Sequence, residues 1–113
     1  MIREVPPASG LRDRVQLQRK EQTGEDEGGM ATVYVPTMTL WARVTAIGAR
    51  PATVADARSA VVTHTVVIRF RTGVSPGDRF IYRGRALEVL SAEDLSGRRA
   101  FLACRCSETA VKG

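Results

Sequence analysis

The residues of this chain that could carry chemistry are a histidine, two cysteines and a set of arginines. His64 is the only histidine in the sequence. A catalytic histidine needs a nucleophile or a carboxylate within hydrogen-bonding distance. Its neighbours Thr63 and Thr65 are turned to the opposite face if the segment is a strand, because side chains alternate along a strand. The sequence therefore favours a structural role for His64 over a catalytic one.

The two cysteines, Cys104 and Cys106, stand two residues apart in a segment of strand composition. At that spacing both side chains face the same side, nearly parallel, which disfavours a disulfide between them. A metal site would need further ligands, and His64 is the only histidine available. We therefore expect two small apolar side chains packed against the core, with no metal and no cofactor.

A polar stretch at residues 21–29 combines carboxylates with glycines. Its acidic residues are Glu21, Glu25, Asp26 and Glu27. They lack the alternating ligands and closing glutamate of a calcium loop. Gly28 and Gly29 open no helix and precede no Lys-Ser/Thr pair, so they do not form a phosphate-binding loop. Nowhere does the sequence offer a set of residues typical of catalysis, and this argues against an enzyme.

The charge is strongly basic, with a formal net charge of +5 and a pI near 10.0. An excess of positive charge is typical of proteins that bind nucleic acid. The arginines are scattered along the chain, however, and this distribution is more typical of a solvated surface or a protein interface. Five arginines fall on strands that we expect to be neighbours, namely Arg69, Arg71, Arg79, Arg83 and Arg85. They could follow phosphates or pair with an acidic surface on a neighbouring subunit. Few aromatic side chains accompany them for base stacking, so we favour the subunit interface.

Length and composition indicate one globular domain of 113 residues. The hydrophobic share of 43% is too high for a disordered chain, and the aromatic share of 5% implies an aliphatic core. No apolar run reaches the roughly 18–20 residues that span a bilayer. The N-terminus lacks the apolar region of a secretory signal. A cytoplasmic protein without membrane contact is the simplest expectation.

Alternating apolar and polar residues predict six short strands. They lie at residues 11–20, 32–47, 61–71, 79–83, 85–92 and 99–107. Pro36 marks an edge, a bulge or a strand start. The sequence Ser75-Pro76-Gly77-Asp78 fits a type II turn, and Gly84 fits a tight hairpin. Six strands without a long helix predict an all-β sandwich or small barrel.

The domain organisation follows from the segments between these strands. Residues 1–10 contain Pro6, Pro7 and Gly10 and are expected to form an extended N-terminal arm. Residues 11–107 form a single β-barrel domain, and residues 108–113 a flexible tail. A long loop is expected at residues 48–60, where Thr53 could cap a short helix or the segment could order only on assembly.

A spaced set of residues runs through most of these strands. It consists of Trp41-Ala42-x-Val44, Thr63-His64 through Ile68-Arg69, Gly73-Val74, Pro76-Gly77, Arg79, Tyr82, Gly84-Arg85 and Val89. Together with the first strand, LRDRVQLQRK, this pattern resembles the head-closure (head–tail joining, or stopper) proteins of tailed bacteriophages and phage-like particles, gene transfer agents included. The resemblance covers residues 11–105. The chain departs from the family in its longer N-terminal arm and in Ala86, where a bulkier residue is usual.

The resemblance implies a β-barrel that assembles as a ring of roughly six or twelve copies beneath the portal and its adaptor. Such rings retain packaged double-stranded DNA and provide the docking surface for the tail terminator or tail tube. The expected location is thus the head–tail interface of a particle made in the bacterial cytoplasm. In relatives the loop before the Thr-His strand projects into the channel. Here it contains Gly48, Ala49, Arg50, Pro51, Thr53, Asp56 and Arg58.

Two readings of the function remain open besides a distant enzyme reading. The leading one is a structural connector without catalysis, whose subunit interface uses Trp41 and the five arginines, since Trp41 lies on the less apolar face of its strand. The alternative is a small β-barrel nucleic-acid-binding protein, which the pI and the arginine content support.

Overall fold

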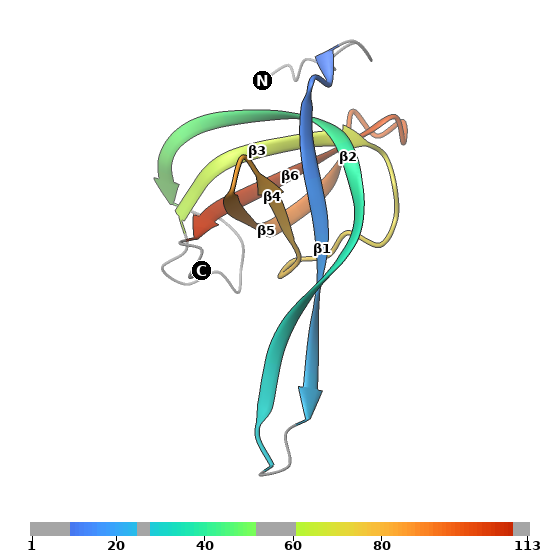
Figure 1. The fold of residues 1–113 in the computed structure, drawn as a ribbon. Coiled ribbons are helices and arrows are strands. Elements are labelled where there is room, and N and C mark those ends of the chain that lie inside the picture. Colours follow the sequence, from blue (N-terminus) through green and yellow to red (C-terminus); the bar gives the residue numbers. More distant parts are fainter. Residues whose placement is uncertain (1–9, 25–27, 52–60, 110–113) are drawn as a thin grey trace.

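The computed structural model describes residues 10–24, 28–51 and 61–109, with side chains described except at 49–51. Six antiparallel strands form a closed barrel in the order β1-β2-β3-β6-β5-β4 (Figure 1). The strands are β1 (Asp13–Gly24), β2 (Met30–Pro51), β3 (Val61–Arg69), β4 (Arg79–Tyr82), β5 (Arg85–Leu95) and β6 (Phe101–Thr109). The predicted all-β fold is confirmed, as a barrel rather than a sandwich. The described residues contain no helix that could cross a membrane.

The barrel interior is mainly aliphatic, as the low aromatic content predicts, with Phe80 as its largest fully buried side chain. In β3 the alternate residues Val62, His64, Val66 and Ile68 are buried, while the residues between them face outward. The main core comprises Val15, Leu17, Ala42, Val66, Ile68, Phe80, Leu87, Val89, Leu102, Cys104 and Cys106. Burying such side chains contributes about 1.5–3 kcal/mol for each large aliphatic group.

A second, smaller cluster lies apart from the main core. It contains Leu11, Leu95, Phe101 and Ala103, with Val67 packed against it. Phe101 and Ala103 alternate with the inward-facing Leu102 and Cys104, so β6 is buried on both faces at its start. Leu11, just before β1, therefore covers the outer side of the barrel wall and helps to shape the surface described below.

Strands β1 and β2 continue beyond the barrel as a two-stranded projection, which we call the hairpin arm (residues 18–24 and 30–36). Its pairing runs from Gln18↔Pro36 to Gly24↔Met30. Figure 1 shows this arm projecting from one end of the barrel, and the molecule measures 50 × 29 × 26 Å. Four residues of the polar stretch, 21–24, continue β1, whereas residues 25–27 lie outside the described part of the chain.

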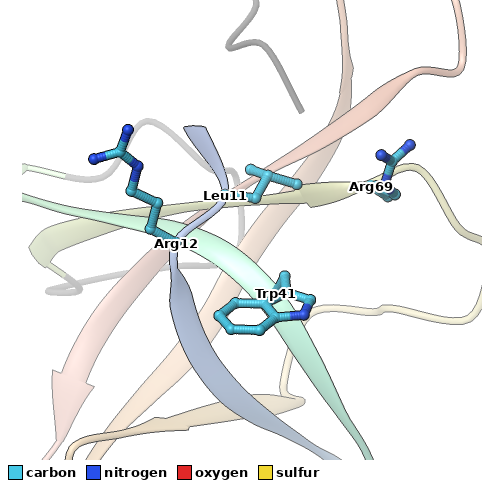
Figure 2. Close-up of a pocket in the computed structure, with 4 residues that line it drawn as sticks. All are labelled: Leu11, Arg12, Trp41 and Arg69. Atoms are coloured by element: carbon cyan, nitrogen blue, oxygen red, sulfur yellow. The ribbon is translucent and has the colours of Figure 1, made fainter. Parts of the chain in front are cut away.

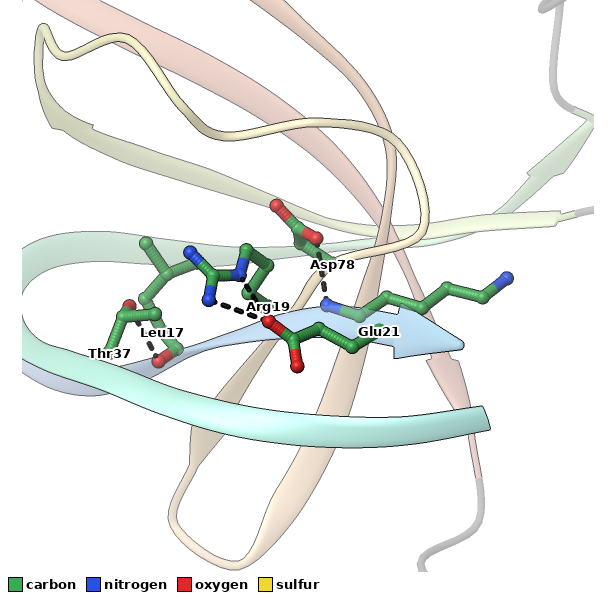
Figure 3. Close-up of polar contacts among 6 residues, drawn as sticks. Leu17, Arg19, Glu21, Thr37 and Asp78 are labelled. Atoms are coloured by element: carbon green, nitrogen blue, oxygen red, sulfur yellow. Dashed lines mark hydrogen bonds and ion pairs between the residues drawn. The ribbon is translucent and has the colours of Figure 1, made fainter. Parts of the chain in front are cut away.

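The arm begins at a β-bulge. The register shifts between Leu17 and Gln18, whose partners are Met38 and Pro36, so Thr37 has no partner of its own. The Thr37 hydroxyl donates a hydrogen bond to the Leu17 carbonyl at 3.1 Å (Figure 3). A bulge increases strand twist and redirects the chain. The interpretation of Pro36 as a bulge marker is confirmed.

A buried carboxylate fastens the base of the arm. Asp78, only 4% exposed, accepts hydrogen bonds from the backbone N–H groups of Lys20 and Ser75, each at 3.0 Å. Figure 3 shows the Asp78 side chain beside the arm strand. Asp78 also donates its own N–H to the Ser75 carbonyl at 3.1 Å, and Gly77 has a φ of 98°. These features confirm the predicted type II turn.

The predicted long loop begins later than expected. Strand β2 continues to Pro51, which pairs with Val61 of β3. Four residues assigned to the loop therefore belong to the strand, namely Gly48, Ala49, Arg50 and Pro51. Glycine and proline read as strand breakers, but Gly48 adopts a φ of 74° at a register shift and Pro51 ends the strand. Thr53, Asp56 and Arg58 lie outside the described residues.

The bounds of other strands differ from the prediction as well. Strand β6 continues into the predicted tail, since Glu108 pairs with Leu87 and Thr109 with Ala86. Pairing with the well-buried β5 holds these two polar residues in the sheet. Strand β3 ends at Arg69, so Arg71 follows the strand rather than belonging to it. The N-terminal arm at residues 1–9 and the last four residues lie outside the described part of the chain.

Candidate assembly surface

Trp41 is the most conspicuous side chain on the outside of the barrel. It is 54% exposed, whereas the adjacent Ala42 is fully buried. Arg14 is its cross-strand partner, and the Arg14 guanidinium carbon lies 4.6 Å from the centre of the indole ring. This cation–π contact orients the ring but leaves more than half of the side chain open to a partner.

Two depressions meet at Trp41 and Arg69, and we call them together the Trp41 groove. One has a volume of about 510 Å³ and is lined by Leu11, Arg12, Trp41 and Arg69 (Figure 2). The other has a volume of about 340 Å³ and is lined by Thr39, Leu40, Trp41, Arg69, Phe70 and Arg71. The groove thus joins apolar surface with arginine side chains, and both kinds of group are enriched at protein interfaces.

Arg71 lines the second of these depressions. Its Nη1 donates to the sulfur of Met38 at 2.6 Å. Its Nε is the one buried side-chain nitrogen or oxygen of the described residues that has no hydrogen-bond partner. An unpaired buried donor costs about 1–3 kcal/mol. Such a cost is common where a side chain serves something other than the stability of the isolated chain.

Arg79 has a different environment from that expected of an interface residue. Its Nε donates to the Gln18 side-chain oxygen at 2.6 Å. Its guanidinium carbon lies 3.8 Å from the centre of the Tyr34 ring. Both partners belong to the base of the hairpin arm, so Arg79 joins β4 to the arm within one chain.

Arg83 and Arg85 lie at the tight β4–β5 hairpin. Arg83 and Gly84 have φ values of 51° and 78°, as a two-residue type I′ turn requires. Both arginines border a depression of about 400 Å³ that also touches Val44, Ala46, His64 and Tyr82. Arg85 lies 3.7 Å from the Glu108 carboxylate, so its charge is paired within the chain.

The five arginines that the sequence placed on neighbouring strands are separated by the barrel. Strand β3 pairs with β2 and β6, whereas β4 pairs with β1 and β5. Arg69 and Arg71 therefore share the Trp41 groove, Arg79 contacts the arm, and Arg83 and Arg85 lie at the β4–β5 turn. The expectation failed because consecutive strands need not be adjacent when the chain crosses over to close a barrel.

His64 has the partners that the sequence reasoning did not foresee. The Thr63 hydroxyl lies 2.8 Å from His64 Nδ1 and accepts the Glu108 backbone N–H, also at 2.8 Å. A Glu108 carboxylate oxygen lies 4.0 Å from His64 Nε2. Thr63 lies on the outward face of β3, as the alternation predicts, yet its hydroxyl contacts the ring of His64. The Thr63 hydroxyl thus connects His64 of β3 with Glu108 near the end of β6.

The two cysteines are free, buried and on the same face, as predicted. Burial raises the pKa of the Cys104 thiol to about 12. Burial, followed by the nearby Cys104 and Glu88, raises the pKa of Cys106 even further. No group of three potential metal ligands occurs among the described residues.

Comparison with known proteins decides the family. Residues 6–109 match a family model described as the phage head completion protein. This chain belongs to that family. The resemblance seen in the sequence is thus confirmed, and the protein acts at the head end of a phage or phage-like particle. The family is one of phage structural proteins rather than of enzymes.

Solved structures with the same fold cover nearly the whole chain. The solution structure of protein SF1141 from Shigella flexneri 2a is 27% identical with a TM-score of 0.69, covering 93% of this chain and 98% of that one. A chain of the virion of a native gene transfer agent particle is 18% identical with a TM-score of 0.65, covering 89% and 97%. No curated protein matches the sequence. At 18% identity, the similarity to the gene transfer agent chain shows a shared fold only.

Sequence reasoning missed three residues of this surface, namely Leu11, Arg12 and Arg14. The sequence analysis placed all three in the predicted strand at residues 11–20 without assigning them to a surface. The register Arg14↔Trp41 brings them to the tryptophan, and a register between distant segments is not visible in either segment alone.

Proposed function

We propose that this head completion protein forms a ring of roughly six or twelve copies beneath the portal and its adaptor. In that position it closes the filled head, retains double-stranded DNA and presents a docking surface to the tail terminator or tail tube. The observation that carries the proposal is the family match over residues 6–109. The likeness to a chain of a gene transfer agent virion supports the same role in a phage-like particle.

Trp41, Arg69 and Arg71 supply the subunit interface in this proposal. They share one groove, and its mixture of exposed indole and cations suits a protein partner. Arg83 and Arg85 offer a second contact surface at the β4–β5 turn. Arg79 belongs to the same proposal, with its guanidinium already in contact with Gln18 and Tyr34 of its own chain.

The segment between β2 and β3 is proposed to line or narrow the channel. Because β2 extends to Pro51, the candidate gating residues reduce to those beyond the strand, among them Thr53, Asp56 and Arg58. Deletion of residues 52–58 is expected to leave the barrel folded, because the core of the described residues is built from the six strands. The same deletion should impair DNA retention, measured as the fraction of DNA-filled heads; an unchanged fraction would reject the gating role.

Electron microscopy of particles from a strain that lacks this gene tests the proposed function directly. Heads and tails should accumulate separately, and the heads should lose their DNA. Normal tailed particles filled with DNA would reject the proposal.

One observation favours the alternative, a nucleic-acid-binding protein. Arg14 stacks on an exposed Trp41, and Arg69 lies beside it. A stacking platform with cations is also what single-stranded nucleic acid binds. Binding of the isolated protein to free duplex DNA separates the two functions.

A further inference from the structure

The part of β2 that belongs to the hairpin arm has an unprotected composition. No charged residue occurs between Gly29 and Arg43, and residues 30–35 are rich in Val, Thr and Tyr. Met30 is 63% exposed and Val33 is 40% exposed. A short uncharged segment of high β propensity without proline pairs readily with another strand. Natural sheets normally carry charges along such an edge to prevent this pairing, and this segment has none.

Both strands of the arm have an outer edge to which residues 10–24, 28–51 and 61–109 contribute no strand. Strand β3 pairs with β2 only from Ala42 onward, and β4 pairs with β1 only as far as Gln18. Figure 1 shows the two arm strands leaving the barrel together. A two-stranded ribbon is marginally stable in water by itself. The arm therefore offers two free edges, one on each strand.

The contact of Asp78 shows which backbone groups lie on these edges. The Lys20 N–H points away from β2, since it donates to the Asp78 carboxylate. Lys20 pairs with Tyr34, and both members of such an antiparallel pair direct their N–H and C=O groups away from each other. The same holds two residues further along, where Gln22 pairs with Thr32. The N–H groups of Thr32 and Tyr34 thus lie on the free edge of β2, and that of Gln22 lies on the free edge of β1.

We propose that the free edge of β2 in one copy pairs with the free edge of β1 in the next copy. This inference rests on the proposed ring and names a contact within it. When the arms of a ring run along its axis, β2 of each copy lies beside β1 of its neighbour. Because β1 and β2 are antiparallel within one chain, these two strands are antiparallel as well. The contact joins two different edges, so it repeats from copy to copy and closes with the ring.

The two edges fit each other better than either fits a copy of itself. Arg19 and Glu21 of β1 form an ion pair at 2.6 Å, so this strand brings little net charge against the uncharged β2. Pairing of β1 with a second β1 would place the Lys20 side chains of both copies close together. Pairing of β2 with a second β2 would give a two-fold dimer and leave both β1 edges free. Only the pairing of β2 with β1 removes every free edge of the arms.

Hydrogen exchange of single backbone amides tests the pairing in the unaltered protein. The N–H groups of Thr32, Tyr34 and Gln22 should exchange at least about tenfold more slowly in assembled particles than in the free protein, since paired amides exchange only when their strand opens. The N–H groups of Val33 and Val35 point toward β1 of their own chain and serve as internal controls. In the free protein they should already exchange more slowly than those of Thr32 and Tyr34.

Two results of this measurement would overturn the proposal. One is equal exchange of the Thr32 and Tyr34 amides in the free protein and in particles. The other is slower exchange at Thr32 and Tyr34 without any change at Gln22, because another strand would then cover β2.

Disulfide formation between two co-expressed variants identifies the neighbour. One variant carries Val33→Cys and the other carries Glu21→Cys, and both are produced in the strain that lacks the native gene. With the arms at equal height, the two positions face each other in a pair whose Cα atoms lie about 4.5 Å apart, which a disulfide can span. The native Cys104 and Cys106 are buried and do not take part. Oxidised particles should then contain a product of twice 12.3 kDa.

Further variants fix the register and provide the control. Arg19→Cys and Thr23→Cys in place of Glu21→Cys test the neighbouring registers on the same face, and the highest yield reports the register. Val61→Cys is the matched control for Val33→Cys, because Val61 is 37% exposed but lies on β3, outside the arm. It should give no product with any of the three. A dimer formed by Val33→Cys alone would show pairing of two β2 strands and overturn the proposal.

The proposed function and the proposed contact fail in different ways. DNA-filled, tailed particles in which none of the three β1 positions cross-links to Val33→Cys would reject the contact and leave the head-closure role intact. Normal particles from the strain without the gene would reject the role itself.

Discussion

Two thiols lie close together inside the barrel with nothing to stabilise a negative charge. Cys104 and Cys106 follow each other on the inner face of β6, and Cys106 donates its S–H to the Cys104 carbonyl at 3.7 Å. Desolvation favours the neutral form of a buried thiol. The pKa of Cys104 accordingly rises from 9.0 to about 12, and that of Cys106 rises further.

The raised pKa values predict a loss of stability in alkaline solution. Unfolded thiols release their protons near pH 9, whereas the folded thiols keep theirs, so the stabilisation is complete below pH 9 and is lost as the pH rises toward 12. The two thiols should together remove about 2–3 kcal/mol of unfolding free energy between pH 8 and 10. Urea unfolding at both values measures this loss. In Cys104→Ala/Cys106→Ala this part of the pH dependence should disappear, and an unchanged slope would contradict the argument.

At the scale of elements, the hairpin arm depends on a few contacts at its base. The bulge at Thr37 turns the strand pair, and Asp78 fastens Lys20 to the β3–β4 connection. Arg79 adds its contacts to Gln18 and Tyr34. The arm is thus held at its base by the barrel but carries no core residue toward its tip.

Removal of the Asp78 carboxylate should destabilise the protein. Asp78→Ala leaves the N–H groups of Lys20 and Ser75 without their acceptor, at a cost of about 2–3 kcal/mol in unfolding free energy. Asp94→Ala is the matched control, because Asp94 also accepts a backbone N–H, from Arg99, but in an exposed setting. Its cost should stay below about 1 kcal/mol. Equal losses in urea titrations would show that burial of Asp78 is unimportant.

The arm itself should be dispensable for folding. The register pairs Lys20 with Tyr34, so replacing residues 21–33 by Asn-Gly closes a two-residue hairpin at that point. Since no core residue is removed, the unfolding free energy should change by less than about 1 kcal/mol. Urea unfolding of the variant beside the unaltered protein measures this change, and a loss well above 1 kcal/mol would contradict the argument.

At the scale of the whole molecule, the net charge of +5 is divided among separate places. Arg69 and Arg71 line the Trp41 groove, Arg79 is bound to the arm, and Arg83 and Arg85 lie at the β4–β5 turn. No single stripe of cations results from this set. The free protein should therefore show only weak, salt-sensitive binding to duplex DNA.

Fluorescence anisotropy with a labelled duplex measures this binding. At 0.15 M salt the expected Kd is about 10⁻⁴ M or weaker, the range of non-specific contacts, and it should weaken further with added salt. Arg43→Glu, at an exposed position outside the Trp41 groove, serves as a comparison for Arg69→Glu. A Kd below about 10⁻⁶ M would favour the nucleic-acid-binding alternative instead.

The sequence by itself determined the strands, the turns and the family. Alternation in β3 fixed its inner face, the Pro76-Gly77 pair fixed a turn, and the spaced residues from Trp41 to Val89 identified the relatives. These features are local, because side-chain periodicity and turn geometry depend on a few consecutive residues.

Only the tertiary structure decided which of these elements meet. Barrel closure separates Arg69 from Arg79, and the register of β1 against β2 brings Arg14 to Trp41. The same closure gives His64 its contact with Glu108 at the end of β6. Such contacts join residues far apart in the chain, and strand order and register follow from packing the whole core rather than from any single segment.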